Sequence, residues 1–277
     1  MNGHIDAHHH VWSLARGDYD WLSPALEPIY RDFSLADLAP LREQAGVAAT
    51  VLVQAAPTLA ETKYLLDVAT RSDGIVKGVV GWVDLGAADA IPTLTRLARN
   101  PLLKAVRPML QDLPDVAWIL RTEVGRTLAA LPRIGLRFDA LVKPAQLPAL
   151  LTMLDRHPDL AVVVDHGGKP DIAGGGWEPW ARLMRAVAAN PRVRCKLSGL
   201  VTEAGKGWTI DMLRRYVDFL AETFGAQRLM WGSDWPVVNL TATYQSWYAA
   251  TVALTAAWSP DDKAALMSGT ARRFYGL

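Results

Sequence analysis

The chain has 277 residues, of which 51% are hydrophobic and 21% are charged, a composition typical of a globular protein with a large core. Its 29 basic and 28 acidic residues give a net charge of +1, which excludes the strongly basic surface that nucleic acid requires. A single cysteine excludes an intramolecular disulfide, and the absence of a secretory signal or of an apolar run of ~18 residues predicts a cytoplasmic protein that does not enter the membrane.

The first predicted strand leads into the segment Asp6-Ala7-His8-His9-His10-Val11-Trp12. Side chains alternate between the two faces of a strand, so His8 and His10 share one face and His9 points to the other. Paired imidazoles hold a divalent ion or polarise a carbonyl group directly. The alternative is the remnant of a tag, and the elements that follow decide between the two.

Short apolar runs then alternate with segments of helical spacing. The first helix is expected over residues 35–45, with Ser34 at its start and a kink or break at Pro40, and Thr58 with Glu61 predicts a capping box for the next one. Further strands are predicted over residues 48–54, 76–83, 103–108, 136–142, 161–166, 193–197 and 228–232. Further helices are predicted over residues 88–99, 116–128, 147–156, 179–189, 210–223, 244–257 and 260–274.

Eight strands that alternate with helices predict an α/β fold, namely a single, distorted (β/α)8 TIM barrel with a C-terminal helix that spans residues 1–277 as one domain. A doubly wound open sheet is the competing architecture. It normally carries a glycine-rich phosphate loop after an early strand, and none follows the first strand here.

Polar residues stand at the ends of the predicted strands, where a barrel of this type holds its active site. They are His8, His10, Arg107, Asp139, Asp165, His166, Lys196, Ser198, Ser233 and Asp234. Lys196 and Asp139 also fit a second interpretation, a charge pair inside the barrel. Trp82 and Trp235 lie near strand ends as well, where an indole either walls a small polar ligand or belongs to the core.

Four segments carry a resemblance to a known family. They are Asp6 to Trp12, Val164-Asp165-His166-Gly167-Gly168-Lys169-Pro170, Cys195-Lys196-Leu197-Ser198-Gly199-Leu200 and Trp231-Gly232-Ser233-Asp234-Trp235-Pro236. In this order the chain resembles the amidohydrolase-related sugar-acid lactonases, the group that includes L-fuconolactonases and L-rhamnonolactonases. The resemblance implies a (β/α)8 barrel that hydrolyses an aldono-1,4- or 1,5-lactone, such as L-fuconolactone, L-rhamnonolactone or L-galactonolactone, to the aldonic acid.

The resemblance also implies roles for the residues at the strand ends. Asp234 is the expected general base on water, while His8, His10 and His166 polarise the carbonyl group. The expected substrate-binding residues are Arg107, Lys196, Trp82, Trp235 and Asp139. If one zinc-like ion is bound, its ligands come from His8, His10, His166 and Asp234, although an activated ester also reacts without a metal.

The resemblance also implies that there is no two-metal centre. Two-metal amidohydrolases use a bridging lysine or glutamate from the third or fourth strand and usually a histidine from the fifth, whereas this chain has Arg107 on the fourth strand and no histidine on the fifth. Two other functions remain open at this stage. One is a hydrolase or decarboxylase for a pyrone or an aromatic acid, which would need several cationic anchors where the strand ends offer mainly Arg107 and Lys196. The other is a sugar-binding protein without turnover. The sugar and the oligomeric state are not determined by the sequence.

Overall fold

Eight parallel strands form one sheet, in the order in which they occur along the chain. The computed structural model describes residues 3–277. The strands are β1 (His4–His9), β2 (Val47–Val53), β3 (Val76–Gly81), β4 (Leu103–Val106), β5 (Arg137–Ala140), β6 (Val162–Val164), β7 (Arg194–Leu197) and β8 (Leu229–Trp231). The sheet closes where His9 pairs with Trp235 just beyond β8, and His10 N donates to Trp235 O at 2.7 Å. The predicted TIM barrel is therefore confirmed.

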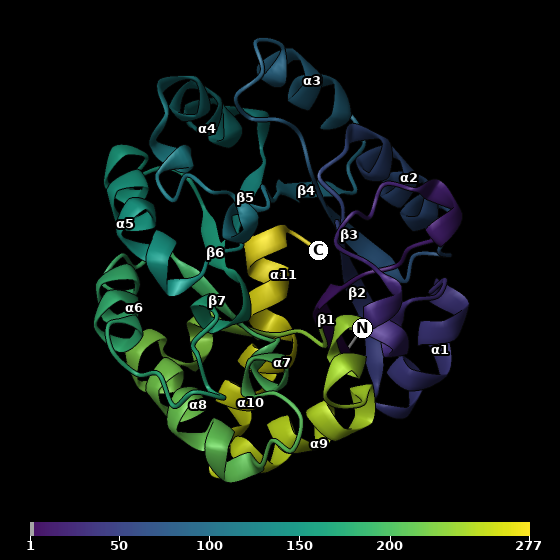
Figure 1. Cartoon of the computed structure of the whole chain (residues 1–277), viewed down its shortest axis with the longest axis vertical. Coiled ribbons are helices and arrows are strands. Elements are labelled where there is room, and N and C mark those ends of the chain that lie inside the picture. The colour runs from purple at the N-terminus through teal and green to yellow at the C-terminus, as the bar shows by residue number, and fades with distance from the viewer. Residues whose placement is uncertain (1–2) are drawn as a thin grey trace.

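Helices surround the strands, as Figure 1 shows in a view along the barrel. They are α1 (Leu35–Gln44), α2 (Leu59–Thr70), α3 (Ala90–Leu97), α4 (Thr122–Ile134), α5 (Leu147–Arg156), α6 (Trp180–Ala188), α7 (Leu200–Ala204), α8 (Ile210–Phe224), α9 (Tyr244–Leu254), α10 (Pro260–Ala264) and α11 (Thr270–Tyr275). Within residues 3–277, none of these helices combines the length and the apolar character needed to cross a membrane.

Two helix predictions need correction in their extent. The helix expected over residues 116–128 is instead a 3₁₀ turn at Trp118–Leu120 followed by α4, which ends at Gly135 in the left-handed conformation (φ 84°). Glycine stops a helix efficiently because it has no Cβ, so Gly135 marks the end of this helix better than its hydrophobic spacing does. The last helix, expected over residues 260–274, is interrupted by a π-helical turn at Ala265–Gly269.

The first two predicted helices also differ in detail from the expectation. Helix α1 continues through Pro40, which removes only one backbone donor, while a capping box between Ser34 and Asp37 secures its first turn. At α2, Thr58 Oγ1 accepts from Glu61 N at 3.0 Å. The Glu61 side chain does not complete a capping box, because its carboxylate accepts instead from the backbone of the loop that follows β2.

The buried residues form an outer and an inner cluster. The outer cluster lies between the strands and the surrounding helices, whereas the inner one fills the barrel with alternate strand residues such as Val51, Val163 and Met230. Phe274 and Tyr275 of α11 complete the inner cluster. The chain end is tied to the starts of β4 and β5 by bonds from Lys104 Nζ to Gly276 O (3.1 Å) and from Arg137 Nε to Phe274 O (2.7 Å). Helix α11 thus closes the N-terminal end of the barrel, and the opposite end is left for a site.

Candidate active site

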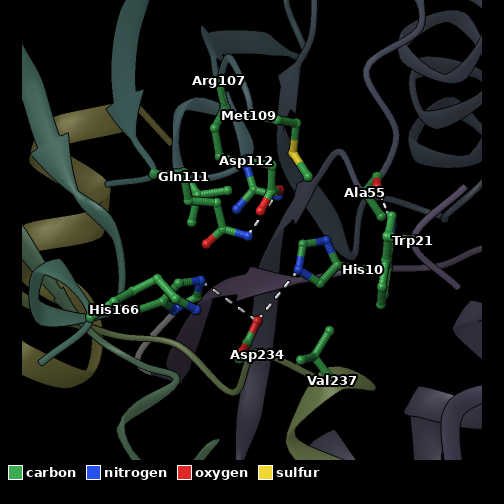
Figure 2. Close-up of a pocket in the computed structure, with 12 residues that line it drawn as sticks. His10, Trp21, Ala55, Arg107, Met109, Gln111, Asp112, His166, Asp234 and Val237 are labelled. Atoms are coloured by element: carbon green, nitrogen blue, oxygen red, sulfur yellow. Dashed lines mark hydrogen bonds and ion pairs between the residues drawn. The ribbon is translucent and has the colours of Figure 1, made fainter. Parts of the chain in front are cut away.

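A cavity of about 300 Å³ lies at the C-terminal ends of the strands, within the size range of small-molecule sites. Of the residues predicted at strand ends, His10, Arg107, His166 and Asp234 line it (Figure 2). His8 is buried directly against them, with its ring centroid 5.0 Å from that of His10 and 4.5 Å from that of His166. We call this cavity the catalytic pocket.

The Asp234 carboxylate is the centre of the group. Its Oδ1 atom lies 3.4 Å from His10 Nε2, 3.7 Å from His8 Nε2 and 3.9 Å from His166 Nε2. Figure 2 shows His10 and His166 approaching this oxygen from two sides of the pocket. Three imidazoles therefore share one carboxylate oxygen, although they come from the ends of β1 and β6.

The backbone after β8 brings Asp234 to this position. Asp234 has a left-handed conformation (φ 58°), which aspartate tolerates better than most residues, and its N donates to His8 O at 2.8 Å. Gly232 lies so close to β1 that an added Cβ would be 2.6 Å from the Cβ of His8. The same contacts between β1 and the segment after β8 thus close the barrel and position the Asp234 carboxylate.

A bulge in β1 places His8. Ile5 and Ala7 both belong to the inner cluster, and simple alternation would turn His8 outward. The pairing with β2 shifts register between Asp6 and His9, so Ala7 and His8 both face the barrel interior. His9 points away and bonds to Thr50 Oγ1 at 2.9 Å, as its place between the two other histidines predicts.

His10 and His166 are each oriented by a hydrogen bond at Nδ1, the ring nitrogen that faces away from Asp234. His10 Nδ1 is 2.8 Å from Val53 O, an acceptor, so Nδ1 carries the proton and Nε2 presents its lone pair to the pocket. His166 Nδ1 is 2.8 Å from Ser198 Oγ. His166 itself has φ 53°, within the tight turn Asp165–Gly168 that reverses the chain after β6. The Nδ1 hydrogen bonds thus fix the orientation of the His10 and His166 rings, with Nε2 directed toward Asp234.

Burial sets the charges of the pocket. It lowers the pKa of His166 to about 4, and together with the Lys196 ammonium it lowers the pKa of His8 well below its usual value. Burial acts to raise the pKa of Asp234, but the positive charges that His166, His8 and His10 carry when protonated outweigh it, and this pKa is lowered. At neutral pH the site therefore pairs an ionised carboxylate with neutral His8 and His166.

A buried charge network lies against His8. Lys196 Nζ is 2.6 Å from Asp139 Oδ2, 3.0 Å from Asp165 Oδ1 and 3.1 Å from His8 Nδ1, while Arg107 Nη1 is 3.2 Å from Asp165 Oδ2. The two cations and two carboxylates balance, as buried charges must. Asp139 and Lys196 are fully buried and do not reach the wall of the catalytic pocket.

The predicted tryptophans are placed differently from the histidines. Trp235 is buried and packs edge-on against Phe33 with a ring-centroid distance of 5.2 Å, away from the pocket wall. Trp82 lines a neighbouring cavity.

Several residues of the site were given no role in the prediction. Asp165, which was placed at a predicted strand end, contacts three members of the group. Gln54 Oε1 accepts from Arg107 Nε at 3.1 Å. Gln54 was the last residue of the second predicted strand, so the strand-end rule applied evenly would have found it. The loop residues of the pocket carried no such signal: Trp21, Met109, Gln111, Asp112, Lys169 and Val237.

Donor atoms of His8, His10 and Asp234 lie within 4.8 Å of one another, and so do those of His8, Asp165 and His166. Two donors of a tetrahedral zinc ion are separated by about 3.3 Å, because each lies about 2.0 Å from the metal. The 3.4 Å between His10 Nε2 and Asp234 Oδ1 meets this requirement, and His10 already presents a lone pair. The donor set therefore fits one divalent cation.

The chain is similar in sequence and in fold to known proteins. The family model described as amidohydrolase matches residues 5–277. An L-fucono-1,5-lactonase of Burkholderia ambifaria is 45% identical over 100% of this chain and 97% of its own, and one of Burkholderia multivorans is 35% identical over 99% and 96%. The crystal structure of an amidohydrolase from Burkholderia multivorans with bound zinc superposes with a TM-score of 0.93 at 35% identity, over 99% of each chain.

Proposed function

Because this chain belongs to the amidohydrolase family, we propose that it is a hydrolase that opens a sugar-acid lactone to the aldonic acid. One observation of the site carries the proposal. A buried, ionised carboxylate faces three imidazoles in a pocket of about 300 Å³, with a buried guanidinium on its wall. The names of the two lactonase relatives make a 1,5-lactone of L-fuconate the first substrate to test.

Asp234 is the general base in this reaction. Its carboxylate takes a proton from a water molecule, which attacks the lactone carbonyl, and the protonated Asp234 then returns the proton to the ring oxygen that leaves as an alkoxide. Arg107 and Lys169 are the cations on the pocket wall, and they stabilise the negative charge that develops on the carbonyl oxygen. The Arg107 guanidinium is held by Gln54 and Asp165, so its position on the pocket wall is fixed.

His8, His10 and Asp234 would hold a zinc-like ion, with His166 beside them. When bound, such an ion supplies a Lewis acid for the carbonyl group and lowers the pKa of water. Val53 O and Ser198 Oγ fix the rings of His10 and His166, in the way that outer hydrogen bonds orient metal-binding histidines.

Lys196 and Asp139 position the site and do not bind the substrate. Their contact with each other and with Asp165 holds the charges that surround His8. The pocket offers two cationic side chains, Arg107 and Lys169, and Lys169 is already paired with Glu203 at 2.5 Å. A neutral polyhydroxylated ring therefore suits the pocket better than a pyrone dicarboxylate.

Acid release from a panel of aldonolactones, followed with a pH indicator, tests the proposal. Asp234→Asn is the matched variant, since asparagine also tolerates φ 58° and the fold should be retained. Loss of a general base lowers turnover by about 10²- to 10⁴-fold. Near-normal hydrolysis by this variant would overturn the role of Asp234, and no hydrolysis of any lactone by the wild-type protein would overturn the function.

The requirement for a metal is tested with the wild-type enzyme and the same lactone assay. Activity is measured after exhaustive chelation and after the return of zinc, with metal analysis of each preparation. Restoration in proportion to bound zinc supports an ion that takes part in the reaction. Full activity in the metal-free protein would leave the three imidazoles and Arg107 as the groups that polarise the carbonyl.

A further inference from the structure

A second cavity, of about 400 Å³, opens beside the catalytic pocket at the same end of the barrel. We call it the outer pocket. Trp21, Met109 and Asp112 line both cavities, so the two share a wall. Figure 2 shows Trp21 and Met109 across the catalytic pocket from His166. A molecule that reaches past these side chains would occupy both spaces.

Aromatic and acidic side chains dominate the outer pocket. Trp21, Trp82 and Trp118 are each half-buried there, so part of every indole remains open to a ligand. Trp21 is immobile, because its Nε1 donates to Ala55 O at 2.7 Å and its ring meets Trp12 edge-on. Flat indole faces suit the apolar face of a cyclic ligand.

The acidic side chains of the outer pocket define the polarity of its ligand. They are Asp20, Asp84 and Asp112, all exposed, and among the residues described no lysine, arginine or histidine lines this cavity. Ionised carboxylates only accept hydrogen bonds, so they favour a ligand with hydroxyl donors and repel an anion. The catalytic pocket differs in that its wall carries two cations, Arg107 and Lys169, beside the carboxylates of Asp112 and Asp234.

We propose that the outer pocket binds a neutral, hydroxylated ring, so that the enzyme accepts sugar lactones that carry a second, uncharged sugar residue. The lactone ring occupies the catalytic pocket and the second residue lies among the tryptophans of the outer pocket. The lactone half of this proposal rests on the proposed function. The binding of a neutral sugar ring among the tryptophans does not depend on it.

The kinetic test uses three substrates: the aldonolactone that the wild-type enzyme hydrolyses fastest, its β-glucopyranosyl derivative and its β-glucuronosyl derivative. The variant is Trp118→Leu, which removes an indole that lines only the outer pocket, and the control is Trp258→Leu, a half-buried tryptophan outside both cavities. We expect Trp118→Leu to raise KM for the glucosyl lactone by about five- to tenfold and to leave the parent lactone within about twofold. The control should change neither.

The variant Asp84→Asn tests whether the carboxylates of the outer pocket repel an anionic ligand. The wild-type enzyme should show a higher KM for the glucuronosyl than for the glucosyl lactone, and Asp84→Asn should reduce this difference in KM. The proposal is overturned if Trp118→Leu affects the parent and glucosyl lactones equally, or if the wild-type enzyme hydrolyses the parent and not its glucosyl derivative.

A binding experiment separates this proposal from the function of the catalytic pocket. Saturation-transfer NMR with methyl β-D-glucopyranoside and methyl β-D-glucuronide needs no turnover. A signal for the neutral glycoside that is lost in Trp118→Leu and kept in Trp258→Leu supports the outer pocket even if no lactone is hydrolysed. An equal signal in both variants, or a stronger one for the glucuronide, overturns it.

Discussion

Replacement of Gly199 by alanine should lower activity without removing any group that takes part in the reaction. Gly199 has φ 65°, and an added Cβ would lie 2.6 Å from His166 Nδ1. Ordinary van der Waals contact begins at 3.4 Å, so the imidazole must retreat by the difference, about 0.8 Å, or break its bond to Ser198 Oγ. Misplacement of about 1 Å costs up to 10²-fold in rate, so we expect kcat/KM to fall by about 10- to 100-fold, or ~1.4 to 2.7 kcal/mol.

The backbone strain of this substitution needs its own control. Gly135 has φ 84° in the same left-handed region, and a Cβ there would meet nothing within 4 Å. Both Gly199→Ala and Gly135→Ala force alanine into the left-handed region at a cost of ~1 to 2 kcal/mol in stability, but only the first displaces His166. Lactone hydrolysis and urea denaturation of the two variants separate strain from displacement. Activity of Gly199→Ala within twofold of the wild type, or an equal loss in Gly135→Ala, would refute the reasoning.

Three further predictions concern buried charges and the metal. Burial raises the pKa of Glu61 to about 7, so the native state keeps a proton that the unfolded state releases above ~4.5, and stability is lost as pH rises through 7. Relative to Glu61→Gln, the wild-type protein should therefore lose up to about 3 kcal/mol in the free energy of unfolding between pH 5 and pH 8.5, measured by urea denaturation. A difference between the two proteins that stays constant with pH would contradict this. Lys196→Met leaves the buried Asp139 without its cation, with only the Tyr275 hydroxyl as a partner, and should cost about 3 to 5 kcal/mol by the same method. Lys196→Met with Asp139→Leu should restore part of this stability, and a loss below ~1 kcal/mol in Lys196→Met would argue against the network. His10→Ala should weaken zinc binding at least about tenfold in dialysis against buffered zinc, and unchanged zinc content would exclude His10 as a ligand.

The barrel and the list of strand-end residues could be predicted because both depend on local patterns. Apolar runs bounded by turns identify strands, and parallel strands with helical connections must carry their polar ends at one edge. His10, His166 and Asp234 each lie within three residues of the end of a strand, so they converge once the barrel exists. Helix boundaries were less well predicted where a capping residue competed with hydrophobic spacing, as Gly135 did at the end of α4.

Only the tertiary structure decided which of these residues reach the pocket. The shifted register in β1 turns His8 inward, and this depends on the pairing with β2 rather than on the histidine run itself. Lys196 and Asp139 have the same strand-end signature as Asp234, yet they lie buried against each other because their charges need partners inside the barrel. Trp21 and Met109 come from loops whose path depends on distant contacts, so no local pattern marks them as the wall between the two cavities. The sequence alone thus determined the barrel and the residues at its catalytic end, while contacts between distant segments decided which of them face the substrate.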